Sequence, residues 1–174
     1  YFNPVGAHPS ALIGELPLGR PENLFPAITQ TATGKLPQLI VYGNDYPTRD
    51  RSCIRDYIHV CDIAHAHTLA LQYLINKENK SKCDIFNLGS GNGVTVLEAI
   101  TAFERISGQK LNYKIGPRRP GDVIAIYANN DLAVERLNWE IGYDLDTMMR
   151  TAWAWELNIK KDEELVTRQN PVLN

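Results

Sequence analysis

The sequence lacks the long apolar runs and the charge excess that mark several classes of protein. No apolar run in its 174 residues approaches the roughly 20 residues of a membrane span, and its amino terminus has no signal-peptide layout. Its formal net charge is only −2, so no overall field favours nucleic acid or an anionic membrane. We therefore expect neither nucleic acid nor a membrane as a partner, and we expect any anion to be bound by a few placed residues.

The sequence also has few cysteines. The three present, Cys53, Cys61 and Cys83, are an odd number and lack the spacing of a CxxC pair. Disulfide scaffolds and structural zinc sites need paired cysteines, so the pattern favours a reduced protein in the cytoplasm.

Three histidines lie close together in the stretch "CIRDYIHVCDIAHAH", which suggests a metal site at first sight. His65 and His67 are two residues apart on a predicted helix and point about 200° away from each other, so they cannot chelate one ion. His59 lies on a predicted strand beside apolar residues, where a histidine is usually packed and hydrogen-bonded. We expect no metal site here.

What the sequence does contain is an alternation of strand and helix patterns, which is typical of the α/β class. A long loop rich in Gly and Pro is predicted over 4–24. Helices are predicted at 24–33, from a cap at Asp62 through Leu74, at 95–108, at 130–137 and at 144–159. Strands are predicted at 39–42, 54–60, 85–88 and 111–115, and a charged tail follows Lys160.

The glycine-rich turn Gly89-Ser90-Gly91-Asn92-Gly93 follows a predicted strand and precedes a capping box at Thr95 and Glu98. Its spacing is GxGxG, whereas a dinucleotide fingerprint reads GxGxxG and is followed by an acidic residue about twenty positions later. We interpret the turn as a tight connection and expect no NAD site of the chain's own.

The turn Arg118-Arg119-Pro120-Gly121-Asp122 places two guanidinium groups and a carboxylate together. Paired arginines suit phosphate oxygens, and a nearby aspartate can accept from sugar hydroxyls. Taken alone, a solvated basic turn is an equally common explanation. Together with Arg55 on a strand face, the turn predicts two arginines from distant segments that close on one nucleotide diphosphate.

Six segments, in this order and spacing, resemble the carboxyl-terminal half of the UDP-glucose 4-epimerases, a family of extended short-chain dehydrogenases/reductases. They are "YFNPVGAHPS", "ENLFP", "VYGNDYPT", "IRDYIHVCDIAHAH", "FNLGSGNGVTVLE" and "RRPGD". The resemblance covers residues 1 to about 157. A looser form of the RDYIHV pattern also occurs in related nucleotide-sugar dehydratases and decarboxylases.

The resemblance implies a UDP-sugar site at nine positions. It places Asn3 near the diphosphate and hexose, the backbone of Ile40 and the ring of Tyr42 beside the uracil, and Arg55 and Arg119 on the diphosphate. The full set is Asn3, Asn23, Leu24, Ile40, Tyr42, Arg55, Arg119, Asp122 and Ile126.

Four of these positions need a further comment. Asn23 and Leu24 lie along the substrate in the family, and Asp122 would reach a ribose hydroxyl. Ile126 stands where the family has a residue whose bulk is linked to tolerance of N-acetylated sugars. Because Ile is neither the large nor the small extreme, the choice between hexose and N-acetylhexosamine stays open.

The resemblance implies NAD as the cofactor of a longer parent protein, with Tyr1 and Pro4 beside it. We expect the catalytic Tyr-x-x-x-Lys pair and the NAD fingerprint to be missing from this chain, which begins with Tyr1 and not Met. The chain would then be a piece of a longer enzyme that binds substrate but supplies no catalytic residue and does not hold NAD alone. The family also implies a homodimer and a role in galactose metabolism.

On this interpretation, residues 1–3 and 57–91 belong to an incomplete Rossmann domain, residues 4–56 and 92–160 form the nucleotide-sugar lobe, and residues 161–174 are a tail. The missing amino-terminal Rossmann half would be the partner of the chain. Two alternatives stay open: a non-catalytic UDP-sugar-binding module, and a fragment of a related dehydratase or decarboxylase.

One stretch departs from the family pattern. Where the family has T-x-D-G-T before the RDYIHV arginine, this chain reads Thr48-Arg49-Asp50-Arg51-Ser52. The two added positive charges could favour an anionic substrate, but we expect Arg49 and Arg51 to face solvent.

Overall fold

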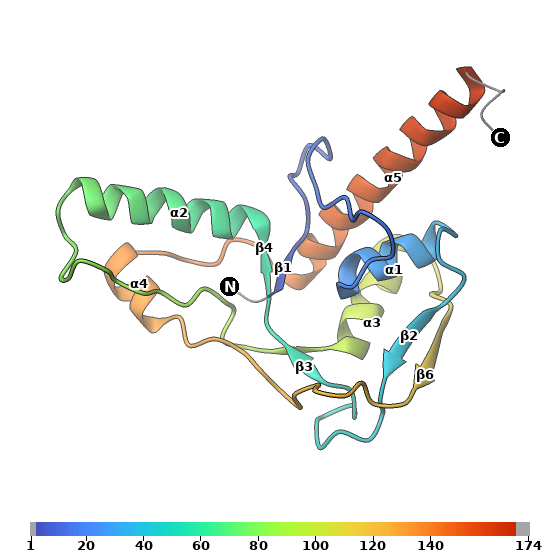
Figure 1. The fold of residues 1–174 in the computed structure, drawn as a ribbon, viewed down its shortest axis with the longest axis horizontal. Coiled ribbons are helices and arrows are strands. Elements are labelled where there is room, and N and C mark those ends of the chain that lie inside the picture. The colour runs from blue at the N-terminus through green and yellow to red at the C-terminus, as the bar shows by residue number, and fades with distance from the viewer. Residues whose placement is uncertain (1–2, 170–174) are drawn as a thin grey trace.

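The structure is a computed structural model that describes residues 3–169, and it confirms the predicted α/β class. Figure 1 shows its elements in two groups, which the central strands connect. In chain order they are β1 (Asn3–Val5), α1 (Leu24–Ala32), β2 (Leu39–Tyr42), β3 (Ile54–Arg55), β4 (Tyr57–His59), α2 (Val60–Ile75), β5 (Val94–Thr95), α3 (Val96–Ser107), β6 (Tyr113–Gly116), α4 (Asp131–Leu137) and α5 (Leu145–Gln169).

The strands pair over long sequence distances in three two-stranded sheets. β1 runs parallel to β4, with Asn3 opposite Tyr57, and β2 runs parallel to β6, with Leu39 opposite Tyr113. β3 and β5 are antiparallel and place Arg55 opposite Val94. Parallel strands need a long crossover connection, so residues far apart in the sequence meet at the β1–β4 and β2–β6 pairs.

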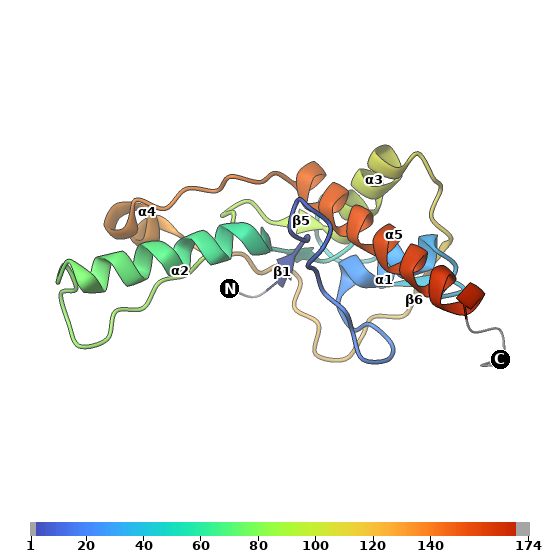
Figure 2. The same ribbon diagram turned by 90° about the horizontal axis from the view of Figure 1, so that it is seen from above.

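The larger core lies between α1, α3, α5 and β2. It buries aromatic and aliphatic side chains such as Phe25, Ile28, Val41, Phe103 and Met149, each at most 2% exposed. Removing such side chains from water is the main force that holds these elements together. Figure 2 shows α5 lying across this group.

The smaller core lies at the other end of the molecule, where α2 and α4 run side by side (Figures 1 and 2). It contains Ile58, Ile63, Tyr73 and the fully buried Trp139. The indole nitrogen of Trp139 donates to the Asp62 carbonyl oxygen at 3.0 Å, so the one polar atom of this ring is satisfied.

Several local predictions are confirmed. The strand at Leu39–Tyr42 is present. α3 begins at a complete capping box, in which Thr95 accepts from the Glu98 amide and Glu98 accepts from the Thr95 amide. It ends at Gly108, whose φ of 69° is the left-handed conformation that glycine adopts without a steric cost.

The predicted strand 54–60 and its helix cap are partly wrong. The strand is interrupted at Asp56, and α2 begins at Val60, before Asp62. The capping group is the His59 ring, whose Nδ1 accepts from the Cys61 amide at 3.0 Å. Asp62 lies in the first turn, and its carboxylate instead accepts from the amides of Gly142 and Tyr143.

Two other predictions are wrong for the same reason. Whether a local pattern forms a strand, or where a helix ends, depends here on segments that are distant in the sequence. Residues 85–88 form no strand, and Ile85 is 77% exposed, since within residues 3–169 no strand pairs with them. α5 does not stop near residue 159 but continues to Gln169, so most of the predicted tail is helical. Lys35 on a facing loop pairs with Glu156 and Glu163 of this helix.

No helix in the described part of the chain is both long and apolar enough to span a membrane.

His59 is fully buried and hydrogen-bonded, as the sequence predicted. Its ring stacks on Tyr143 with centroids 4.0 Å apart, and Nε2 lies 3.0 Å from Thr151 Oγ1. Because Nδ1 accepts a hydrogen bond, Nε2 carries the proton and donates to Thr151. Burial lowers the pKa of His59 to about 4.

We expect this burial to make stability fall in mild acid. The unfolded chain takes up a proton near pH 6.5 but the folded chain only near pH 4, so the stabilisation is complete above about pH 6.5 and is lost as the pH falls towards 4. Urea unfolding at pH 7 and pH 4.5 should show a loss on the order of 2 kcal/mol. The variant His59→Asn keeps a capping oxygen and should show a smaller loss; an equal loss in both proteins would contradict this assignment.

Candidate functional site

A cavity of about 610 Å³ opens beside the larger core. Its walls come from β1, the end of the long loop before α1, β2, β3 and the turn after β6. Nine of the site residues predicted from sequence line it, namely Asn3, Pro4, Asn23, Leu24, Ile40, Tyr42, Arg55, Arg119 and Asp122. Ile126 does not line the cavity and is 37% exposed, and Tyr1 lies outside the described residues.

The two arginines predicted to converge do meet, and they meet on one carboxylate. Oδ1 of Asp122 lies 3.2 Å from Nη2 of Arg55 and 2.9 Å from Nη2 of Arg119. Arg55 is held in place by further hydrogen bonds to the carbonyl oxygens of Ile54 and Val123, at 2.8 and 2.9 Å. The hydrogen bond to Asp122 raises the pKa of Arg119.

Other lining residues are fixed by contacts outside the cavity. Asn3 donates to the Asp56 carbonyl oxygen at 3.0 Å, across the β1–β4 pair. Asn23 stands at the start of α1 but makes no capping hydrogen bond with its side chain, and its side-chain amide group donates to Glu15 at 2.9 Å. The Arg119 guanidinium lies 5.5 Å from the centre of the Tyr42 ring, within range of a cation–π attraction.

Sequence reasoning missed several residues of the cavity wall. Cys53 and Tyr57 are both buried lining residues. They share a strand face with Arg55, so the period of two along this segment could have identified them. Arg20 and Gln38 lie on loops without periodicity, and no local pattern indicated that they face the cavity.

The glycine-rich turn is a tight connection, and the three amides at its centre donate to protein acceptors. The carboxylate of Asp56 accepts from the Ser90 amide and hydroxyl at 2.7 and 2.6 Å, and from the amides of Gly91 and Ala128. A Cβ on Gly89 would lie 2.2 Å from Asp56 Oδ2. The amides of Ser90, Gly91 and Asn92 thus have protein acceptors, and Asp56 fills the space beside Gly89, so the turn lacks the free run of amides with which a dinucleotide fingerprint binds a diphosphate, and it does not fit NAD.

The chain does contain one Tyr-x-x-x-Lys spacing, at Tyr73 and Lys77, contrary to the expectation that none would be present. Tyr73 is buried in the smaller core, and its hydroxyl donates to Asp84 at 3.0 Å. Lys77 is exposed beyond the end of α2, and neither residue lines the cavity. The pair is therefore part of the fold and not of the candidate site.

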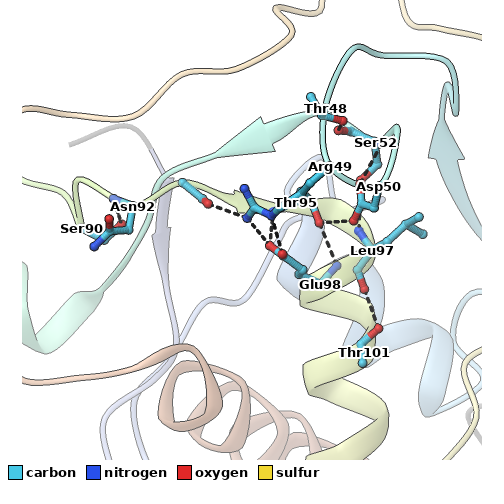
Figure 3. Close-up of polar contacts among 11 residues, drawn as sticks. Thr48, Arg49, Asp50, Ser52, Ser90, Asn92, Thr95, Leu97, Glu98 and Thr101 are labelled. Atoms are coloured by element: carbon cyan, nitrogen blue, oxygen red, sulfur yellow. Dashed lines mark hydrogen bonds and ion pairs between the residues drawn. The ribbon is translucent and has the colours of Figure 1, made fainter.

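Arg49 is exposed, as predicted, but its side chain also has a protein partner that the sequence did not indicate. Figure 3 shows its guanidinium against Glu98, where Nε lies 2.5 Å from Oε1 and Nη2 bonds Oε2. Nη2 also donates to the Gly93 carbonyl oxygen at 2.8 Å, so Arg49 ties the loop to the start of α3. Arg51 is exposed, as predicted, and has a left-handed φ of 69° at the position where the family pattern has glycine.

The three cysteines are free, and residues 3–169 contain no cluster of three or more potential metal ligands. Cys53 is buried beside the arginines, and burial raises the pKa of its thiol.

We expect Arg49→Ala to lower the free energy of unfolding by about 0.5–1 kcal/mol, because it removes an exposed but bidentate pair at a helix terminus. Arg51→Ala is the matched control, since it removes an exposed arginine two residues away whose side chain makes no hydrogen bond or ion pair among residues 3–169. Urea titrations compare the two; equal stabilities would show that the Arg49 pair contributes nothing.

Comparison with known proteins gives the cavity a context. The family model for GDP-mannose 4,6 dehydratase matches residues 8–152. The UDP-glucose 4-epimerase of Pisum sativum is 52% identical over 158 residues, and that of Bacillus subtilis is 47% identical over 156 residues. These matches cover 91% and 90% of this chain but 45% of each relative, so the chain spans less than half the length of the relatives it matches.

Solved structures of UDP-glucose 4-epimerases also resemble this chain. A UDP-glucose 4-epimerase from Stenotrophomonas maltophila with bound NAD and formylated UDP-arabinopyranose superimposes with a TM-score of 0.88 at 48% identity, over 92% of this chain and 47% of that one. The enzyme from Bifidobacterium longum in complex with NAD+ and UDP gives 0.84 at 42% identity, over 90% and 45%. These findings confirm the resemblance noted in the sequence. The chain therefore belongs to the short-chain dehydrogenase/reductase family described by the GDP-mannose 4,6 dehydratase model, and it resembles UDP-glucose 4-epimerases over most of its length.

Proposed function

We propose that this chain is the UDP-sugar-binding part of a UDP-glucose 4-epimerase, an enzyme that inverts C4 of the hexose by transient oxidation with bound NAD. The observation that carries the proposal is the pair of arginines, 64 residues apart in the sequence, that meet in one cavity. The curated relatives and solved structures that match the chain are named as UDP-glucose 4-epimerases, some with NAD and UDP bound.

The arginine pair suits a diphosphate because guanidinium groups bind phosphate oxygens through paired N–H donors. Without substrate, Asp122 neutralises part of this charge by accepting from both arginines. Phosphate oxygens would compete for the same donors, and the Asp122 carboxylate would then be available to a ribose hydroxyl. One carboxylate thus keeps the two cations together and is poised to contact the nucleoside.

The nucleoside would extend along β2, where Tyr42 offers a ring for the uracil and Ile40 its backbone. Leu24 and Asn23 line the same cavity at the start of α1, and Asn3 lines it at β1. Ile126 lies outside this wall, so we propose that it acts at the hexose end in the complete enzyme. Binding energy from UDP would hold the nucleotide while the hexose stays free to turn.

The cofactor would be held mainly by another part of the enzyme. In this chain only Pro4, at the edge of the cavity, and Tyr1 are proposed to lie beside it. When bound, NAD supplies a hydride acceptor and donor. The residues of this chain bind and orient the sugar nucleotide, and none of them is proposed as a catalytic acid or base.

The partner we propose is the amino-terminal Rossmann half. A parallel pair such as β1–β4 usually belongs to a larger sheet that is covered on both faces. Beside it, the outer side of α2 and the segment that follows expose Leu71, Leu74, Ile75 and Ile85, each more than half exposed. Residues 1–3 and 57–91 would complete that domain, and 4–56 and 92–160 would form the sugar-nucleotide lobe, with α5 continuing beyond it to Gln169. A cytoplasmic homodimer with a role in galactose metabolism is the assembly we propose for the complete enzyme.

Titration of UDP into the chain by calorimetry tests the site. We expect Arg55→Ala and Arg119→Ala each to weaken binding by about tenfold or more, because each removes a charge-assisted contact to phosphate. Arg105→Ala is the control, since Arg105 pairs with Asp146 outside the cavity. Unchanged affinity in both cavity variants would contradict the site, provided that their urea transitions match that of the parent.

Fusing the chain behind the part of the Pisum sativum epimerase that precedes its match tests the enzyme assignment. The fusion should interconvert UDP-glucose and UDP-galactose, whereas the chain alone should not, because the fusion adds the cofactor-binding half. Arg55→Ala in the fusion should raise KM. A well-folded fusion that binds UDP without converting it would favour the non-catalytic binding module instead.

A further inference from the structure

The cavity has a charge balance that depends on one arginine with no assigned role. Its charged lining residues are Arg20, Glu22, Arg55, Arg119 and Asp122. Three arginines against two carboxylates give a net charge of +1. Without Arg20 the lining would be neutral, although the diphosphate of a sugar nucleotide carries two negative charges.

Arg20 differs from the other two arginines because its charge is not compensated. Arg55 and Arg119 both bond Asp122, whereas Arg20 makes no hydrogen bond or ion pair with any residue in the range 3–169. Its side chain is exposed at the cavity. A free guanidinium can bind an anion without first breaking an internal ion pair.

The backbone that carries Arg20 is nevertheless held in place. The next residue, Pro21, is buried, and a residue before proline is restricted to extended conformations. Earlier in the same loop, Trp155 donates to the Glu15 carbonyl oxygen at 2.8 Å and Asn158 to the Ala11 carbonyl oxygen at 2.9 Å. The loop is thus anchored to α5 at Ala11 and Glu15, and the segment that carries Arg20 ends at the buried Pro21.

We propose that Arg20 is a third phosphate-binding arginine, which contacts the anionic diphosphate of the sugar nucleotide from the loop side of the cavity. This inference rests on the proposed function, because it takes the cavity to be the UDP-sugar site. Arg20 would contribute to affinity through the charge of the phosphates and not through the base or the ribose. The expected contribution is small, since an exposed ion pair is worth little in water and is screened by salt.

Calorimetric titrations of uridine, UMP and UDP into the chain and into Arg20→Gln, at low and high ionic strength, test the inference. We expect Arg20→Gln to weaken UDP binding by about two- to fivefold at low salt, with a smaller loss at high salt and no change for uridine. Arg20→Lys should recover part of the affinity because it restores the charge. Arg51→Gln is the matched control, since it removes an equal charge from an exposed residue that does not line the cavity.

The outcomes separate this inference from the function on which it rests. If the chain binds UDP and Arg20→Gln behaves like Arg51→Gln, only the role of Arg20 is overturned. Equal losses for uridine and UDP would also overturn it, because they would mean that Arg20 shapes the loop and does not contact phosphate. If the folded chain does not bind UDP at all, the proposed function and this inference are both wrong.

Discussion

The direction in which successive side chains point along residues 55–59 is the constraint on which the rest of the molecule depends. Arg55 enters the cavity, and Asp56 points away from it to the glycine-rich turn. Tyr57 packs in the larger core and Ile58 in the smaller one. His59 then caps α2. One short segment thereby joins two hydrophobic cores, starts a helix and positions a phosphate-binding arginine, and a shift of one residue would reverse every one of these contacts.

Two carboxylates beside this segment have different roles because their donors differ. Asp56 is 3% exposed and accepts hydrogen bonds from backbone amides of two separate loops, so its carboxylate stabilises the fold. Asp122 accepts from two arginines whose other N–H groups can still bind a ligand. The first carboxylate closes a glycine-rich turn that would otherwise resemble an anion site. The second keeps a true pair of cations together in the cavity.

Local patterns predicted those features whose partners are near in the sequence. The capping box at Thr95 and Glu98 and the left-handed end at Gly108 depend on bonds within a few residues. The strand 39–42 was found from its apolar run, and the two arginines from their chemistry. Local patterns failed where residues distant in the sequence decide the structure. Residues 85–88 have no strand beside them within the described structure, and Arg49 pairs with Glu98, which is 49 positions away. Tyr73 and Lys77 illustrate the opposite error. They have the spacing of a catalytic motif, but Tyr73 is packed in the smaller core and the pair forms no active site.

The sequence by itself determined the α/β class and the arginines, since these follow from residue type, spacing and local hydrogen bonding, and its resemblance to the epimerases gave the family and nine of the residues that line the cavity. Only the tertiary structure decided that both arginines share one oxygen of Asp122, that Asp56 fills the glycine-rich turn, and that Arg20 reaches the cavity unpaired. The physical reason is that hydrogen bonds and ion pairs act over a few ångströms. Which groups come that close is set by how the two cores pack, and no single stretch of the chain encodes it.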